Sequence, residues 1–581
     1  MVVRNEAHII REALDSVAPY IRSWVIVDTG SDDWTQAVIR NHMARLGIPG
    51  ELYERPWRNF SDNRTEALTL AQGHGDYIWV MEADDTLVGT LDFGPLGADL
   101  YELRRRSPYG TFWRPQLFRD ELRVRHQDVA HEYVVCEDRS VGERLEGDYH
   151  IAGRRLSARN LDPQKYALDR DLLLAEVERD PEHAQSVFYL AQSYFDLGDF
   201  GNARKWYARR SEMGGPDEEV YYATYQIAAS MAGSGASWPD VHDAYLRAWE
   251  LRPTRAEPLY AIALHYREDQ RYRLGYQYAK LAAEIPFPEQ DQLFVLADVY
   301  AWGATDEQAV CASWIDKHAE AFTLWRRLLA RSDLPGDDRT RIAANRDVCA
   351  PTMIEAASSY PDALIPSLQR LAVGARATEV VVSLVAGPDL ARIERTLNSF
   401  LNCCTDVSRV GRFLVLDAGL PAQDRTTLCE RYGFLEFARW GPAEEPGAQL
   451  AQLRSQIDGR YWLHLGDGWR FFAPENVITR LTAVLEAEAQ VFQVGINFAD
   501  AVKLTGASAP EAAMRRTPDA GRYVLTEEVA GGPAMFDTAR LDRAGGVHAI
   551  DQDPFAALGR RAITAGLRTA SLDEVLCIAS V

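Results

Sequence analysis

Cysteine is scarce in this chain and is not spaced for metal or disulfide chemistry. Seven cysteines are spread over 581 residues, and Cys403 and Cys404 form the one adjacent pair. Zinc sites and disulfide frameworks use closely spaced pairs such as CxxC, and the chain contains none. We therefore expect reduced thiols and a cytoplasmic protein.

Long apolar runs and positive charge are also in short supply. The first residues, Met1 to Glu6, lack the apolar core of a signal peptide, and no run reaches the about 20 apolar residues of a membrane-spanning helix. Lysine and arginine number 63 against 85 aspartates and glutamates, a net charge of −22. The lack of long apolar runs leads us to expect no transmembrane segment. A surface with this negative charge repels phosphate backbones, so we also expect no nucleic-acid partner. Arg104 to Arg106 are a local exception that is suited to one phosphorylated ligand.

The chain is long enough for several domains. Hydrophobic residues make up 47% and charged residues 25%, which is the balance of a folded protein. A chain of this length is expected to form roughly three or four domains. We predict an α/β domain over residues 1–160, an all-α repeat domain over 161–350 and a second α/β domain over 375–581.

The first region alternates strand and helix patterns. Runs of β-forming residues at 23–28 and 76–81 each end in an acidic turn, and residues 34–45 and 62–72 have the periodicity of amphipathic helices. This alternation predicts a mostly parallel sheet. Ligands bind such sheets beyond the carboxyl ends of the strands, where both acidic turns lie.

The middle region is repetitive, with a period of about 34 residues that resembles tetratricopeptide repeats. The recurring positions are Leu190, Ala191, Tyr194, Ala203 and Tyr207 in one unit, and Ile262, Ala263, Tyr266 and Ala279 in another. Residues 233–235 and 302–316 are interpreted as insertions, and an irregular helical bundle is the alternative. Stacked helix pairs form concave surfaces, which favours a protein or peptide acceptor or self-association into a homo-oligomer.

Three groups of residues in the first region are suited to sugar transfer. Asp28 ends the first strand, where its carboxylate can accept a hydrogen bond from the imide N–H of uracil; the alternative is a cap on the next helix. Glu82, Ala83 and Asp84 open a crowded acidic turn, which favours Mg²⁺ or Mn²⁺ bound with a diphosphate, although a solvent-exposed turn has the same pattern. Arg64 is placed to contact phosphate, or is an exposed helical arginine.

Sugar transfer also requires a general base near the acceptor hydroxyl. Glu132 is the candidate for removing the acceptor proton, and His131 is the candidate for completing the metal shell or contacting the diphosphate. A His-Glu pair alone is a weak pattern.

Six blocks in this order resemble family-2 glycosyltransferases of the GT-A fold, a Rossmann-like α/β fold. The blocks are Val3 to Glu6, Trp24 to Asp33, Phe60 to Ala67, Tyr77 to Asp85, Arg114 to Arg119 and His131-Glu132. The pattern is most similar to the branch that includes lipopolysaccharide-core β-glucosyltransferases and enzymes with tetratricopeptide repeats behind the catalytic domain.

The resemblance implies an inverting, metal-dependent transferase that moves a hexose or N-acetylhexosamine from a UDP-sugar to a protein, peptide or cell-surface glycan. It implies a donor site formed by Arg4, Asn5, Glu6, Asp28, Gly30, Arg64, Glu82, Ala83 and Asp84, with Glu82, Asp84 and His131 as metal ligands. Glu82 departs from the family, which has aspartate there. The chain also begins inside the family's first strand, which leaves open whether the true start lies upstream.

The third region resembles the same superfamily more faintly. Gly466-Asp467-Gly468 keeps one carboxylate of the metal motif, and Asp551-Gln552-Asp553 lies where the family places its base. We expect a second, diverged GT-A-like domain that is structural or binds the acceptor. A different interpretation of the whole chain is a repeat-based scaffold whose two transferase-like domains are inactive.

Overall fold

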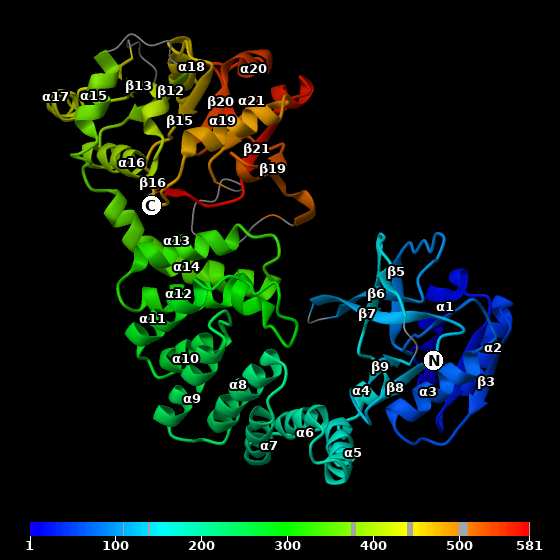
Figure 1. Ribbon diagram of the computed structural model, residues 1–581. Coiled ribbons are helices and arrows are strands. Elements are labelled where there is room, and N and C mark those ends of the chain that lie inside the picture. The colour runs from blue at the N-terminus through cyan, green and yellow to red at the C-terminus, as the bar shows by residue number, and fades with distance from the viewer. Residues whose placement is uncertain are drawn as a thin grey trace. The chain divides into compact units, whose positions relative to one another are not determined.

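A computed structural model describes residues 1–107, 110–137, 140–373, 379–438, 445–497, 509 and 511–579 of the chain. The chain forms two compact units, which are described separately below. The first comprises Met1–His265 with Tyr278–Ala304, and the second comprises Tyr266–Gln277 with Thr305–Val581. Each unit contains one α/β domain and part of the helical repeats (Figure 1).

The first unit opens with a small parallel sheet in the order β1-β2-β3, formed by Val2–Val3, Trp24–Asp28 and Gly50–Glu54. Helices α1 (Ile10–Val17), α2 (Thr35–Leu46) and α3 (Phe60–Ala71) follow the strands in turn. Gly47 ends α2 with a φ of 71°, the left-handed conformation that favours glycine after a helix. The helices predicted over 34–45 and 62–72 are confirmed.

A second, mixed sheet follows in the order β4-β7-β6-β11-β5, with β10 beside β6. Its strands are β4 (Tyr77–Trp79), β5 (Asp85–Gly89), β6 (Leu100–Ser107), β7 (Gly110–Arg119), β10 (Gly142–Arg144) and β11 (Tyr149–Gly153). The β4–β7, β6–β7 and β5–β11 pairs are antiparallel, so the prediction of a mostly parallel sheet is wrong for this half. The connection between β6 and β7 is too short for a crossover, which takes about a dozen residues.

The repeat helices follow a short hairpin of β8 (Val124–Gln127) with β9 (Tyr133–Cys136) and the short α4 (Ala158–Leu161). They are α5 (Lys165–Arg179), α6 (Ala184–Asp196), α7 (Phe200–Glu212), α8 (Asp217–Gly233), α9 (Trp238–Leu251), α10 (Glu257–Glu268) and α11 (Tyr272–Ala283). Helices α5 to α9 pack consecutively, and the predicted repeat residues Leu190, Ala191, Ala203 and Tyr207 are buried. Residues 233–235 are the last residue of α8 and the turn after it, and residues 302–316 contain the end of a π-helix (Val299–Gly303) and helix α12 (Ala304–Ser313). That both segments are insertions in the repeat pattern stays a prediction.

The second unit contains a mixed sheet in the order β14-β13-β12-β15-β20-β17-β21-β19-β18. Its strands are β12 (Val380–Ala386), β13 (Val410–Asp417), β14 (Leu435–Phe437), β15 (Tyr461–His464), β17 (Val491–Gly495), β18 (Arg515–Thr517), β19 (Gly521–Thr526), β20 (Ala534–Asp537) and β21 (Arg568–Leu572). Strands β12 to β15 are parallel, and β20 runs antiparallel to β15 and β17. Residue 375, the predicted start of this domain, lies outside the described residues.

Helices complete the second unit. They are α13 (His318–Leu329), α14 (Gly336–Ala357), α15 (Ile365–Val373), α16 (Leu390–Cys403), α17 (Ala422–Arg431), α18 (Pro446–Ser455), α19 (Val477–Ala487), α20 (Thr538–Arg543) and α21 (Pro554–Thr564). None of the helices in the described part of the chain is both long and apolar enough to cross a membrane.

Candidate active site

Asp28 organises the turn at the carboxyl end of β2. Its Oδ1 accepts hydrogen bonds from the backbone N–H of Gly30 at 3.0 Å, from that of Ser31 at 2.9 Å and from Gln36 Nε2 at 3.0 Å. Gly30 has a φ of 101°, which lets the turn close under the carboxylate. The residue that caps α2 is Trp34, so the alternative role of Asp28 as a helix cap is wrong.

The second carboxylate oxygen of Asp28 is the chemically open one. Oδ2 is buried and has no hydrogen-bond partner among the described residues. Burial alone would raise the pKa of Asp28, but the hydrogen bonds from Ser31, Gln36 and Gly30 outweigh it and leave the pKa below its ordinary value. Asp28 is therefore ionised and has one acceptor atom without a donor, and a ligand N–H is suited to fill that place.

Asn5, in the segment after β1, also holds the turn that follows β2. Asn5, with a φ of 59°, accepts a hydrogen bond from the backbone N–H of Asp32 at 2.9 Å and donates its own N–H to Ser31 Oγ at 2.8 Å. Glu6 is buried, and burial, aided by the charges of Asp84 and Asp33, raises its pKa to about 7. The predicted residues Asn5, Gly30 and Asp28 are thus brought together, while Arg4 is exposed beside them.

The acidic turn after β4 is held by arginines. Arg64 pairs with both oxygens of Glu82, at 2.7 Å from Oε1 and 2.9 Å from Oε2. Burial would raise the pKa of Glu82, but Arg64, with smaller contributions from Arg114 and Arg105, lowers it to about 2. Asp85 makes a two-pronged contact with Arg105, at 2.6 and 2.7 Å.

Glu132 shares Arg64 with Glu82. Arg64 Nη1 lies 2.6 Å from Glu132 Oε1, and Arg114 Nη2 lies 3.7 Å from the same oxygen. The Nη1 contacts are close ion pairs without the angles of good hydrogen bonds. The Glu132 side chain is only 8% exposed, so the structure places a buried carboxylate directly beside the acidic turn.

His131 lies apart from these carboxylates. Its ring stacks on Tyr189 of α6 with the centroids 3.8 Å apart and the planes 4° apart, and its backbone oxygen accepts a hydrogen bond from Gln185 Nε2 at 3.1 Å. Desolvation lowers its pKa to about 4, so the ring is neutral at pH 7. The contacts of the imidazole are therefore with the repeat helices.

The residues just described fall within or directly after a segment with a recognisable family signature. Residues 1–117 match the model of glycosyl transferase family 2. The N-terminal domain belongs to this family. The match ends before Glu132, so the contact with Arg64 is what links this residue to the acidic turn, and His131 faces the repeat helices instead.

One curated relative is named for its tetratricopeptide repeats. A TPR repeat-containing protein of Synechococcus elongatus is 26% identical over 248 residues, which is 38% of this chain and 58% of the relative. The chain thus spans less than two thirds of that relative's length.

Solved structures with partial likeness include two glycosyltransferases. GalNAc-T7 with UDP, GalNAc and Mn²⁺ is 10% identical with a TM-score of 0.28, covering 34% of this chain and 43% of that one. A mannosyltransferase of Pyrobaculum calidifontis with GDP-Man and Mn²⁺ is 14% identical with a TM-score of 0.26, covering 40% and 68%. TM-scores this low carry no conclusion about the present chain.

Of the predicted metal ligands Glu82, Asp84 and His131, Asp84 has a carboxylate oxygen that accepts no hydrogen bond from the described residues. Among the described residues, no three or more His, Cys, Asp and Glu side chains are gathered as a metal cluster. Asp84 Oδ2 accepts hydrogen bonds from Ser157 N at 3.1 Å and Asn160 Nδ2 at 3.3 Å, whereas Oδ1 accepts none from described residues. Asp84 is therefore the predicted ligand with an oxygen open to a cation. Glu82 would have to give up its ion pair with Arg64 to bind one. The role of His131 as a metal ligand stays a prediction.

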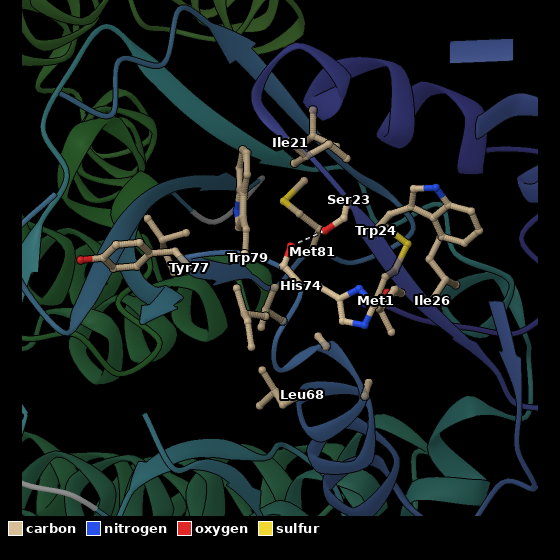
Figure 2. Close-up of a pocket in the computed structure, with 18 of the residues that line it drawn as sticks. Met1, Ile21, Ser23, Trp24, Ile26, Leu68, His74, Tyr77, Trp79 and Met81 are labelled. Carbon is tan, nitrogen blue, oxygen red and sulfur yellow. Dashed lines mark hydrogen bonds between the residues drawn. The ribbon is translucent and has the colours of Figure 1, made fainter. Parts of the chain in front are cut away.

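An apolar cavity of about 320 Å³ adjoins the Arg64–Glu82 pair. It lies between the side chains of β2 and those of β4 and Met81, and the Ser23 hydroxyl donates to the His74 backbone oxygen at its rim (Figure 2). His126 lines it with both ring nitrogens lacking partners among the described residues, and burial lowers its pKa to about 3. Such an apolar wall strengthens the ion pairs beside it by keeping water away.

Some site residues were not predicted. Arg105 holds Asp85, whereas Arg104 pairs with Glu146, because neighbours on a strand point to opposite faces. The predicted cluster of Arg104, Arg105 and Arg106 for one phosphorylated ligand is therefore wrong, because Arg105 points to the opposite face of the strand. The alternation of side chains along a strand could have predicted this separation. Ala83 was predicted in the donor site, but its side chain is buried in the core of the first sheet.

Proposed function

We propose that the glycosyltransferase domain moves a sugar from a nucleoside-diphosphate sugar to an acceptor hydroxyl with inversion at the anomeric carbon. The observation that carries the proposal is Asp28, an ionised carboxylate at a strand end with one buried oxygen and no partner for it among the described residues. An imide N–H of a base is the complementary group, and uracil presents one. We therefore favour a UDP-sugar, with guanine as the base to test against it.

The leaving diphosphate would be neutralised at the acidic turn. Asp84, with Glu82 after rearrangement of Arg64, would hold Mg²⁺ or Mn²⁺, which stabilises charge on the departing phosphate when bound. Once displaced from Glu82, the Arg64 guanidinium is suited to a bidentate contact with a phosphate.

Glu132 would act as the general base. It would take the proton of the acceptor hydroxyl while that oxygen bonds to the anomeric carbon and the bond from this carbon to the diphosphate breaks. The carboxylate is buried beside Arg64, and this contact orients it. Sequence position alone gave this residue weak support, and its contact with the acidic turn is what favours it.

The second α/β domain is best interpreted as a diverged copy. Asp417 at the end of β13 accepts hydrogen bonds from the N–H groups of Gly419 at 3.1 Å and Leu420 at 2.9 Å, as Asp28 does from Gly30 and Ser31. Asp467, its one metal-motif carboxylate, pairs with Arg392 at 3.3 Å. We propose a structural or acceptor-binding role, with a protein, peptide or glycan acceptor that contacts the repeats in the cytoplasm.

The experiment is a donor-hydrolysis assay, because water can replace an unidentified acceptor. Purified protein is incubated with UDP-glucose, UDP-GlcNAc and GDP-mannose, with and without Mn²⁺, and release of the nucleoside diphosphate is followed. We expect release from a UDP-sugar only with metal, lost in Glu132→Gln and in Asp84→Asn. If all nucleotides are neither bound nor cleaved, the repeat-based scaffold with inactive transferase domains is the better interpretation.

A further inference from the structure

The loop that carries His131 and Glu132 has a backbone that its own sequence does not favour. Asp128 has a φ of 79° and His131 a φ of 54°, both in the left-handed region that residues other than glycine seldom occupy. Two such residues within four positions persist only when their surroundings hold them. The φ of His131 also helps to set the direction in which Glu132 leaves the loop.

Both left-handed residues are held by the same repeat helix, α6. His183, which caps α6, lies 3.4 Å from Asp128 Oδ1. Tyr189 stacks on the His131 ring, and Gln185, one turn earlier on the same face, donates to the His131 backbone oxygen. The helix therefore fixes one end of the loop through a side chain and the other end through both a ring and the main chain.

The stretch between these anchors is built into the core of the repeats. Ala130 is 1% exposed and belongs to a cluster with Leu173 and Val177 of α5 and Val187 and Leu190 of α6. Its neighbour Val129 packs against the same cluster and accepts a backbone hydrogen bond from Phe60 N, at the start of α3. Helix α3 carries Arg64, so the loop and the arginine that holds Glu132 are tied to one another by main-chain contact.

We propose that helix α6 is the positioning element for the Glu132 base, with Tyr189 and Gln185 as positioning residues. Helix α6 then supports catalysis in the glycosyltransferase domain, while the other repeat helices remain a surface for partners. This inference rests on the proposed role of Glu132. The proposed effect is one of geometry. The Tyr189 stack and the Gln185 hydrogen bond hold the His131 backbone in the left-handed conformation, and this conformation directs the Glu132 carboxylate to Arg64.

The test compares Tyr189→Phe, which keeps the stack, with Tyr189→Leu, which keeps apolar bulk and removes it. Tyr225→Leu in α8 is the matched control, because within the described part of the chain the ring contacts of Tyr225 are all with repeat tyrosines, one of them Tyr245 at 5.8 Å. Donor hydrolysis should show kcat at least tenfold lower in Tyr189→Leu with the donor KM within twofold of wild type. Tyr189→Phe should match wild type, and Tyr225→Leu should lose stability without losing kcat.

A second measurement keeps the inference testable if turnover is too slow to measure. Amide hydrogen exchange of residues 129–133 should become at least tenfold faster in Tyr189→Leu and stay unchanged in Tyr189→Phe and Tyr225→Leu. Unchanged exchange and unchanged kcat in Tyr189→Leu would overturn the positioning role, even if Glu132→Gln is inactive. Full activity in Glu132→Gln would instead remove the proposed base itself, and the two failures are thus distinct.

Discussion

Arg64→Gln is the substitution with the largest expected effect on the glycosyltransferase domain. Arg64 is the cation that both Glu82 and Glu132 face, with side chains that are only 17%, 26% and 8% exposed. Removing it leaves two carboxylates in a partly buried site without their shared cation, and losing one partner of a buried ion pair costs about 3–5 kcal/mol.

The pKa of Glu82 gives a second route to the magnitude. A tenfold change in proton affinity corresponds to about 1.4 kcal/mol, so a pKa lowered from 4.5 to about 2 corresponds to about 3 kcal/mol. For a domain of this size, that free energy corresponds to a fall in Tm of about 6–12 °C. Scanning calorimetry of the whole chain should show the first unit melting earlier, with the second unit unchanged.

The matched control is Arg40→Gln. Arg40 pairs with Glu54 at 3.2 Å, but both side chains are more than half exposed, so the loss should be about 1 kcal/mol or less. The pH dependence adds a further check. Glu82 has a lowered pKa in the folded chain, so its stabilising contribution is complete above pH 4.5 and is lost as the pH falls toward 2. This loss should be smaller in Arg64→Gln, and equal melting of the two variants would refute the buried network.

Three further predictions concern the donor pocket and its surroundings. Asp28→Asn should weaken UDP binding about 10–100-fold in isothermal titration, since the amide can turn its donor toward the imide N–H, while Tm changes by about 2 °C or less. Glu6 has a raised pKa of about 7, so folding stability should decline as the pH rises from 4.5 through 7; urea unfolding at pH 5 and pH 8 should show this decline flattened in Glu6→Gln. His126 has a lowered pKa of about 3, so stability should fall as the pH drops from 6.5 toward 3, and an unchanged acid profile in His126→Gln would contradict its burial as a neutral ring.

The parts of the site that the sequence predicted are those fixed by local geometry. Asp28 stands at the end of a short β-rich run and before a Thr-Gly-Ser turn, and the hydrogen bonds that hold it come from residues two to eight positions away. The repeat positions Leu190, Ala203 and Tyr207 follow helical spacing, so their burial was readable as well. Such features depend on neighbours along the chain.

The parts that were missed depend on contacts between distant segments. Tyr189 is 58 residues from His131, and no pattern in either segment indicates the stack between them. Arg105 was predicted as one member of a basic cluster, whereas its side chain lies on the strand face that contacts Asp85. The overpredicted parallel sheet is an exception, because a local signal was present: residues 107–110 read Ser-Pro-Tyr-Gly, a sequence typical of a tight turn, between the antiparallel strands β6 and β7.

The central claim is that the N-terminal domain binds a nucleoside-diphosphate sugar through Asp28 and a metal at Asp84. The measurement that tests it most directly is isothermal titration of UDP into the full chain, with and without Mn²⁺, for wild type, Asp28→Asn, Asp84→Asn and the second-domain variant Asp467→Asn. We predict Mn²⁺-dependent binding in wild type and Asp467→Asn, with binding lost in Asp84→Asn and weakened in Asp28→Asn. Binding that survives in Asp28→Asn and Asp84→Asn but disappears in Asp467→Asn would contradict the account and assign the donor site to the second α/β domain.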